Sequence, residues 1–494
     1  MFIEGKSGKW EVVVGLEVHC QLSTNSKLFS RSSTEFGAPQ NTHVSFYDDA
    51  MPGMLPVVNE NAIKLAVKTG IGLNAEFNKD CYFDRKNYFY ADLPSGYQIT
   101  QFFNPIIKNG YIQLSNKKVR IHEAHIEQDA GKSIHDQHPT FTFIDLNRSG
   151  VPLLEIVSEP DIRSPEEAME YLTKLRTLLK ALNTSNADME KGSMRCDANI
   201  SVRKLQEQND NEETSAASPL HSFKGKFGTK VEVKNMNSIH SVSDAIKIEA
   251  ERQVEILEKG GAIDQETRGW DANGMRTYSM RSKEDAIDYR YFPDPDLAPL
   301  NISDEFIEKI RAEMPELPEA KKARYISEFG LNDYDAGVLT ASPDISLYFE
   351  KVVAKHDPKT TCNWITSELF GRLNKLVIPV EESPVSAEML IELLDLIKDN
   401  TISGKIAKDV LDVMIETKKS ANAIVEEKGL KQVVDTSAIE KIADEVIANN
   451  QKQVDEYKGG NDRLFGFFVG QAMKISGGKV NPQIINEILK EKLK

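Results

Sequence analysis

Apolar and polar residues alternate along much of the chain before residue 299. In residues 11–22 apolar side chains occupy every second position, and Glu17, His19 and Gln21 stand between them. A period of two is typical of a β-strand that buries one face. Turn signals such as Asn109-Gly110 separate these stretches, so the pattern predicts a large, mostly antiparallel sheet. The same alternation recurs in residues 119–129, 151–157, 195–203 and 229–235.

Helical patterns interrupt this predicted sheet. Ser164 followed by Pro165 predicts the start of a helix, because serine caps free N–H groups and proline fits the first turn. A second helix is expected from about Ser243 to Gly260-Gly261. The polar segment 205–228 is poor in large apolar residues and predicts a mobile surface loop.

After Pro299 the apolar residues follow a helical period to the end of the chain. In the last segment, Gly477-Gly478 is expected to end one helix. Asn481 then caps the next helix, with Pro482 at its first position. A β-rich part followed by helical parts is the predicted plan.

Composition narrows the class of protein. The 494 residues are 40% hydrophobic and 28% charged, as in an ordinary globular protein. No apolar run approaches the roughly 18 residues that cross a bilayer. The first residues also lack the apolar segment of a secretory signal. We therefore expect a cytoplasmic protein with no membrane partner.

Cysteine spacing and charge exclude further classes. The four cysteines are far apart and none forms a C-x-x-C pair, which argues against a disulfide framework or a zinc ribbon. A net charge of −15 argues against a protein that coats nucleic acid. Residues 463–494 nevertheless carry six basic and two acidic side chains. This patch fits a structured RNA or a solvated helix face about equally well.

Polar side chains on the predicted strands are the strongest candidates for chemistry. Glu17 and His19 share one face, about 6.6 Å apart along the strand. Glu123, His125 and Glu127 share a face by the same rule, and Glu155 interrupts an apolar strand. Carboxylates with an imidazole suit a hard divalent cation such as Mg²⁺ or Mn²⁺. The alternative is that these side chains line the solvated face of an open sheet.

A nucleotide site would need a design other than a P-loop. The segment 129–133, DAGKS, lacks the required glycine, because position 126 is isoleucine. Cations able to spread phosphate charge are present, although each one alone is most often a surface residue. Hydrolase motifs such as G-x-S-x-G and H-E-x-x-H are missing, so the chain is not expected to release ammonia from glutamine. The candidate cations are Lys86, Arg195, Lys230, Lys234, Arg276, Arg281 and Arg290.

Nine strings in order closely resemble the B subunits of the aspartyl/glutamyl-tRNA(Asn/Gln) amidotransferases. The resemblance spans nearly the whole chain and includes VGQAMK and GGKVNPQ near its end. The strings are GLEVHCQL, KLFSRSSTEFG, MPGMLPVVN, FDRKNYFYADLPSGYQITQF, HIEQDAGKS, DLNRSGVPLLEIVSEPD, GSMRCDANISVR, VEVKNMNSI and DYRYFPDPDL.

The resemblance implies an α+β fold in three parts. These are a catalytic cradle built on a mostly antiparallel sheet (1–298), a helical domain (299–415) and a small helical, tRNA-binding tail of the YqeY type (416–494). It also implies a heterotrimer with the A subunit, which is a glutaminase, and the small C subunit. ATP would activate the side-chain carboxylate of Glu-tRNA(Gln) or Asp-tRNA(Asn) as an acyl phosphate. Ammonia from the glutaminase would then displace the phosphate, with Mg²⁺ neutralising charge.

The matching motifs carry residue roles with them. Glu17, His19, Glu127 and Glu155 resemble the Mg²⁺ set, and Glu127 and Glu155 are also expected to act in catalysis. Many relatives have a second acid where this chain has Gln128, which leaves open which of the two positions coordinates. Lys86 resembles a catalytic lysine near the ammonia route. Arg281 and Arg290 are the expected contacts to the ATP phosphates.

One motif departs from the family. Many relatives carry paired cysteines for a structural zinc in the stretch that corresponds to residues 30–48. Ser30, Ser32 and Ser45 stand there in this chain. Serine hydroxyls do not replace thiolates on zinc, so no zinc is expected.

Three other functions remain to be weighed. The related archaeal Glu-specific subunit carries a synthetase-like inserted domain, for which this chain has no room. A noncatalytic tRNA-binding scaffold would need no metal. An autonomous metal hydrolase would be active as an isolated chain. The sequence leaves open whether Gln-tRNA, Asn-tRNA or both are made.

Overall fold

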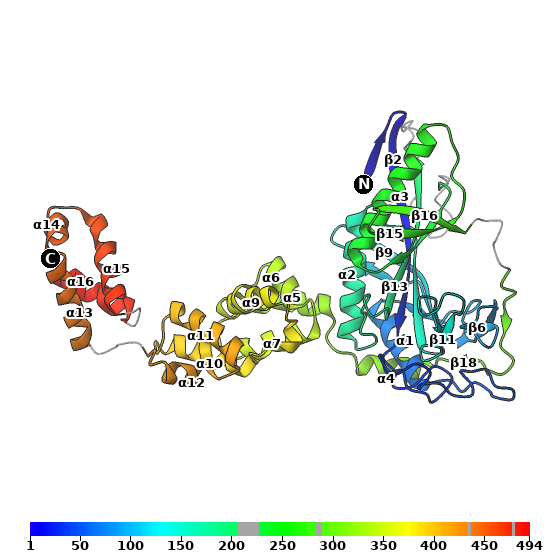
Figure 1. Cartoon of the computed structure of the whole chain (residues 1–494), viewed down its shortest axis with the longest axis horizontal. Helices are drawn as coiled ribbons and strands as arrows, with labels where there is room; N and C mark the ends of the chain where they lie inside the picture. The colour runs from blue at the N-terminus through cyan, green and yellow to red at the C-terminus, as the bar shows by residue number, and fades with distance from the viewer. Residues whose placement is uncertain (206–226, 282–287, 432–435, 477–479) are drawn as a thin grey trace. The chain divides into compact units, whose positions relative to one another are not determined.

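The computed structural model describes residues 1–205, 227–281, 288–431, 436–476 and 480–494. The chain divides into two compact units, Met1–Leu317 and Pro318–Lys494, which are considered separately (Figure 1). Most of the predicted surface loop over 205–228 lies outside the described residues, and so does the expected helix stop at Gly477-Gly478.

The first unit is built on one large sheet. Its strands run in the order β16-β15-β14-β13-β2-β12-β9-β7-β3, with β1 paired to β2 and β8 to β9. All these pairs are antiparallel except β14 with β15, so the predicted α+β fold with a mostly antiparallel sheet is confirmed. The bounds are β1 Phe2–Gly5, β2 Gly8–Gln21, β3 Glu76–Phe77, β7 Ile107–Lys108, β8 Tyr111–Gln113, β9 Lys118–Gln128, β12 Pro152–Ser158, β13 Met194–Lys204, β14 Val231–Met236, β15 Thr267–Asp271 and β16 Arg276–Arg281.

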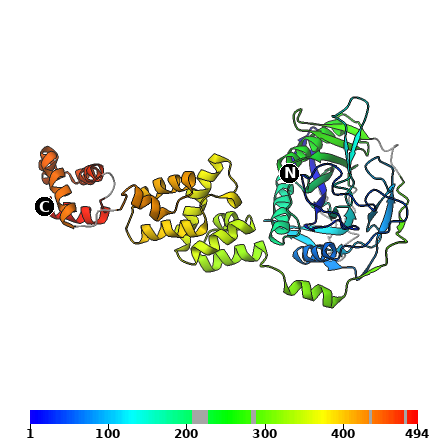
Figure 2. The same ribbon diagram turned by 60° about the horizontal axis from the view of Figure 1, so that its bottom comes forward.

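Two helices pack side by side on one face of this sheet, α2 (Pro165–Ala181) and α3 (Ile239–Glu258) (Figures 1 and 2). Ser164 caps α2 as predicted, and its side chain accepts a hydrogen bond from the Glu167 backbone N–H. The helix α3 begins four residues before the predicted Ser243, because Ser238 caps it by accepting from the Ser241 backbone N–H. The apolar stripes of both helices pack on the β2 side chains that alternate with Glu17 and His19. The opposite face of the sheet therefore carries the polar residues.

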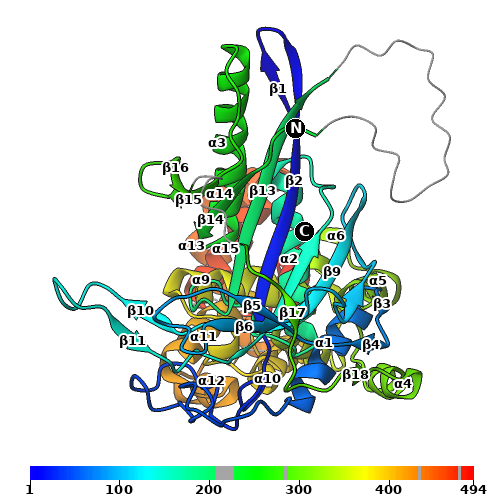
Figure 3. The same cartoon turned by 90° about the vertical axis from the view of Figure 1, so that its right-hand side faces the viewer.

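Smaller elements adjoin the large sheet. The three-stranded sheet β17-β5-β6 lies near the carboxyl end of β2, and its strand β6 packs against β9 (Figure 3). A hairpin of β10 and β11 projects from the same region (Figure 3). The bounds are α1 Glu60–Gly72, β4 Asp80–Cys81, β5 Asp84–Asn87, β6 Tyr97–Thr100, β10 Lys132–Ile134, β11 Phe143–Asp145, β17 Phe292–Pro293, β18 Leu300–Asn301 and α4 Asp304–Ala312.

A buried ion pair fixes the long loop between β2 and α1. The Lys27 ammonium lies 3.2 Å from the Asp48 carboxylate and donates to the Leu146 carbonyl at 3.1 Å. Burial lowers the pKa of Lys27, although Asp48 raises it in part. The Ser30 hydroxyl and the Ser45 backbone N–H also donate to Asp48, at 3.2 and 2.8 Å. Two of the serines in the stretch compared with a zinc site thus bind this carboxylate.

The second unit is helical throughout its described residues. Its apolar residues form two clusters, one from Tyr325 to Val425 and one from Ile439 to Leu493. Asn481 caps α16 with Pro482 at its first position, as the sequence predicts. The bounds are α5 Pro318–Phe329, α6 Asp333–Leu339, α7 Pro343–Val353, α8 Pro358–Asn363, η2 Trp364–Leu369, α9 Phe370–Leu376, η3 Val380–Glu382, α10 Ala387–Lys398, α11 Gly404–Thr417, α12 Ala421–Glu427, α13 Thr436–Asn449, α14 Gln451–Lys458, η4 Asp462–Leu464, α15 Phe465–Ile475 and α16 Pro482–Lys492.

Apolar packing continues across both places where the sequence was divided. Ile307 and Ile310 of α4 belong to the core of the first unit. Ile424 and Val425 of α12 belong to the cluster that begins at Tyr325. The division at 298/299 and 415/416 stays a prediction. Among the described helices, none has both the length and the apolar composition to cross a bilayer.

Two neighbouring residues of α2 test how the core of the first unit is stabilised. Tyr171 is fully buried, and its hydroxyl has no hydrogen-bond partner among the described residues. Tyr171→Phe should raise the free energy of unfolding by about 1 kcal/mol, because it removes a desolvated polar group. Leu172→Ala should lower it by about 2–5 kcal/mol through the cavity it creates. Denaturant unfolding of the full chain measures both, and a destabilised Tyr171→Phe variant would contradict the expectation.

Candidate metal site on the polar face of the sheet

Strand register aligns four polar residues in one row across the sheet. His125 of β9 is the partner of Glu155 of β12, and Glu155 is the partner of His19 of β2. On the other side of β2, His19 is the partner of Arg195 of β13. Partners on neighbouring strands point to the same face about 5 Å apart. The row therefore places two imidazoles, a carboxylate and a guanidinium side by side.

Three side chains converge closely enough to bind one ion. One ligand atom from each of His19, Glu127 and Glu155 lies within 4.8 Å of the others. His19 Nε2 is 3.3 Å from a Glu155 oxygen and 3.6 Å from a Glu127 oxygen. The Glu127 side chain is only 5% exposed. Two carboxylates and an imidazole suit Mg²⁺ or Mn²⁺ with water in the remaining positions.

His125 completes the surroundings of this cluster. Its Nε2 lies 3.2 Å from a Glu155 oxygen, and its Nδ1 lies 3.5 Å from a Glu123 oxygen. Burial alone would lower the pKa of His125, but Glu155 and Glu123 raise it to about 10. His125 is thus a positively charged neighbour that orients Glu155. Residues that contact a metal ligand without binding the metal commonly fix the orientation of that ligand.

The electrostatics of the cluster require positive charge. Burial and the neighbouring Glu155 raise the pKa of Glu127. Burial acts on Glu155 in the same direction, but the two imidazoles outweigh it and hold the pKa of Glu155 well below its usual range. Burial lowers the pKa of His19, yet its carboxylate neighbours raise it on balance. Either imidazolium groups or a divalent cation can supply the compensating charge.

Glu17 belongs to a second acidic cluster on the same face. It lies with Asp197 and Glu232, again with one ligand atom of each within 4.8 Å of the others. The Lys234 ammonium lies 2.5 Å from Asp197 and 3.0 Å from Glu232, and Asn199 donates to Glu17 at 2.7 Å. A lysine therefore already supplies positive charge there. The cluster around His19 is the stronger candidate for a divalent cation.

A lysine and two tyrosines adjoin the first cluster. Lys86 of β5 is near enough for its charge to lower the pKa of Glu127 in part, and its ammonium lies 5.0 Å from the centre of the Tyr289 ring. Burial and nearby acids that include Glu127 raise the pKa of Tyr88 and of Tyr291. These side chains make the cluster a partly enclosed site with a cation at its edge.

The two arginines expected from the sequence at the ATP phosphates are not part of this row. The Arg281 side chain falls outside the described residues, and Arg290 is an exposed residue with a left-handed φ of 44°. Gln128 is absent from the cluster. It lines a separate pocket of about 220 Å³ together with Tyr47 and Asp48. Of the two positions left open by the sequence, the structure brings Glu127 to the cluster.

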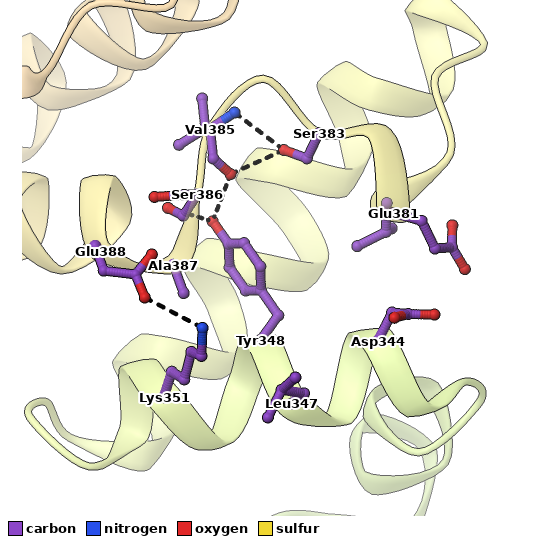
Figure 4. A pocket seen from close by; sticks show the side chains of 11 residues that line it. Asp344, Leu347, Tyr348, Lys351, Glu381, Ser383, Val385, Ser386, Ala387 and Glu388 are labelled. Carbon is purple, nitrogen blue, oxygen red and sulfur yellow. Dashed lines mark hydrogen bonds and ion pairs between the residues drawn. The ribbon is translucent and has the colours of Figure 1, made fainter.

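A pocket in the second unit lacks comparable chemistry. It has a volume of about 260 Å³ and lies between α7 and the start of α10 (Figure 4). The Tyr348 hydroxyl donates to the Val385 and Ser386 carbonyls, and Lys351 pairs with Glu388 at 3.2 Å (Figure 4). These polar groups are directed at one another, so the pocket does not present a reactive centre.

The chain is similar to two known protein families and to full-length bacterial proteins. The family described as the GatB/GatE catalytic domain matches residues 12–308, and the family described as the GatB domain matches residues 347–493. The chain is 54% identical to the B subunit of the aspartyl/glutamyl-tRNA(Asn/Gln) amidotransferase of Rickettsia felis, over 100% of this chain and 99% of that protein. The protein of the same name from Pelagibacter ubique is also 54% identical, over 99% of this chain and 98% of its own length.

Ion binding tests whether the converging side chains form a metal site. Glu127→Gln should weaken Mn²⁺ binding about tenfold or more, because an amide is a poorer ligand than a carboxylate. Glu159→Gln is the control, because Glu159 pairs with the exposed His122 and lies outside the cluster. Electron paramagnetic resonance titration of the full chain measures both affinities. Equal affinities in the two variants would rule out the assignment.

Proposed function

This chain belongs to the GatB family, and on that premise we propose that it carries out the ATP-dependent step of tRNA transamidation. Its substrates are Glu-tRNA(Gln), Asp-tRNA(Asn) or both, and its products are the corresponding amides. The observation that carries the proposal is the convergence of His19, Glu127 and Glu155 from three strands. The names of the full-length relatives support the same reaction.

The proposed reaction has two steps, because a carboxylate is a poor electrophile. In the first, an oxygen of the tRNA-bound carboxylate attacks the γ-phosphorus of ATP. A new O–P bond forms, and the bond to the β-phosphate oxygen breaks, with ADP leaving with the electron pair. In the second, ammonia attacks the acyl carbon, inorganic phosphate leaves, and the nitrogen loses a proton. A bound Mg²⁺ ion would neutralise phosphate charge throughout.

The polar face of the sheet provides groups for both steps. His19, Glu127 and Glu155 would hold the ion, and His125 keeps Glu155 ionised and oriented. Glu17 contributes from the neighbouring cluster. Glu127 is also the carboxylate that we propose accepts a proton from the attacking ammonia. Lys86 stands beside Glu127 and stabilises the negative charge of the acyl phosphate.

We further propose that the chain works in the cytoplasm with two partners. The A subunit, a glutaminase, supplies the ammonia, since the chain has no hydrolase motif of its own. The small C subunit completes the heterotrimer. The basic residues within 463–494 would meet the tRNA. A noncatalytic scaffold is the weaker alternative, because it gives no reason for carboxylates to converge in a poorly solvated place.

The decisive variant for this function is Glu155→Gln. In the assembled complex it should abolish ATP-dependent amidation of the misacylated tRNA, because it removes an ionised ligand. Glutaminase activity, measured as glutamate released from glutamine, should remain near the wild-type rate. Comparable loss of both activities would mean that Glu155 supports the assembly and not the phosphorylation site.

Removal of the last apolar cluster tests the role of the tail. A cut at residue 416 would remove α12, whose Ile424 and Val425 pack in the preceding cluster. A chain that ends at Lys431 keeps that cluster intact. This truncation should raise the KM for tRNA about tenfold, equal to about 1.4 kcal/mol of binding, and change kcat little. Steady-state kinetics of the truncated complex measures this, and an unchanged KM would exclude tRNA binding by the tail.

A further inference from the structure

Arg195 of β13 ends the polar row that crosses the sheet. Its backbone partner is His19, so its side chain points to the same face as the candidate ion ligands. Neighbouring strands are about 5 Å apart. Arg195 is thus the arginine of that row; its backbone lies on β13 beside His19, and its guanidinium reaches to Asp129, which directly follows β9.

The donors of Arg195 are only partly used. Its Nη2 lies 2.9 Å from an Asp129 oxygen. Its Nε is buried and has no hydrogen-bond acceptor among the residues that the structure describes. The side chain as a whole is 40% exposed. Nε and Nη2 are both buried, so the donors that remain for a ligand on the polar face are those of Nη1.

The need to neutralise Asp129 does not by itself explain why an arginine stands at position 195, because Asp129 has other partners. The Asp129 carboxylate is almost completely buried and accepts from the Ala130 backbone N–H at 3.0 Å and from Gln21 Nε2 at 3.2 Å. A second guanidinium, that of Arg148, lies 3.6 Å from it. Asp129 thus has three other partners. It acts as the anchor that holds Arg195 toward the cluster.

We propose that Arg195 is a catalytic residue that binds the γ-phosphoryl group of ATP during its transfer to the tRNA-bound carboxylate. The inference rests on the function proposed above. A guanidinium presents two N–H donors in a plane, which matches two oxygens of a phosphoryl group. Arg195 and the ion ligands share one face of the sheet, so a bound ion and the guanidinium would both be placed to contact the phosphoryl oxygens.

Arg281 and Arg290 are the arginines expected from the sequence at the phosphates, and the Arg281 side chain lies outside the described residues. Arg290 is exposed, and its backbone N–H donates to the Asp288 side chain. Arg195 instead sits in the strand next to His19. As the new O–P bond forms and the bond to ADP breaks, negative charge spreads over the phosphoryl oxygens. Arg195 stabilises this charge without losing a proton.

The test uses the assembled complex with Arg195→Ala, Arg195→Lys and Arg148→Gln. Arg195→Ala should slow tRNA-dependent formation of ADP about 100-fold or more, and Arg195→Lys should keep part of the rate. Guanidinium ions added to the Arg195→Ala complex should restore activity, which a purely structural loss would not allow. Arg148→Gln is the matched control because Arg148 also contacts Asp129, and it should stay near the wild-type rate.

The outcomes separate this inference from the proposed function. A wild-type complex that forms no ADP from ATP and misacylated tRNA would overturn both. An active wild type with an equally active Arg195→Ala complex would overturn only the role of Arg195. Equal losses in Arg195→Ala and Arg148→Gln, with no rescue by guanidinium, would assign both arginines to the fold of the turn at Asp129 and also overturn it.

Discussion

Charge compensation between buried carboxylates governs the polar face of the large sheet. Glu127 and Glu155 lie close together in a place with little access to water, where two negative charges repel strongly. His19 and His125 on the flanking strands offset this repulsion by pairing with Glu155. Burying two carboxylates costs free energy unless positive charge lies beside them. The two imidazoles compensate this charge in the structure, and a divalent cation would do so at the proposed metal site.

The sheet makes this arrangement possible because one of its faces packs against helices and the other carries the polar residues. The face under α2 and α3 is apolar and closely packed, which fixes the strands in register. The register then determines which polar residues meet on the other face. Glu249 of α3 strengthens the connection, since its buried carboxylate accepts from Arg252 and from Thr277 of β16. Rigid packing behind the site thus sets distances within it.

Local pattern and strand pairing contributed differently to what could be predicted. Spacing by two placed Glu17 with His19 and Glu127 with His125, and the structure agrees. The sequence alone does not give the pairing of β2 with β12 and β13, because that depends on contacts between distant segments. For this reason Glu17 was grouped with His19 but lies in the neighbouring cluster, and Asp197, Asn199 and Glu232 were not predicted as its companions. The start of α3 was also misplaced, because the Ser238 cap lies outside the apolar period.

The loop between β2 and α1 has a consequence for how the protein tolerates its surroundings. Its anchor is the pair of Lys27 and Asp48, joined by Ser30 and Ser45, and residues 23–58 contain no cysteine. A loop held in this way draws its order from a buried ion pair and from the hydroxyl and backbone N–H groups that donate to its carboxylate. Its order depends on a protonated Lys27, and loss of that proton at high pH would release the loop, because Asp48 would lose its counter-charge.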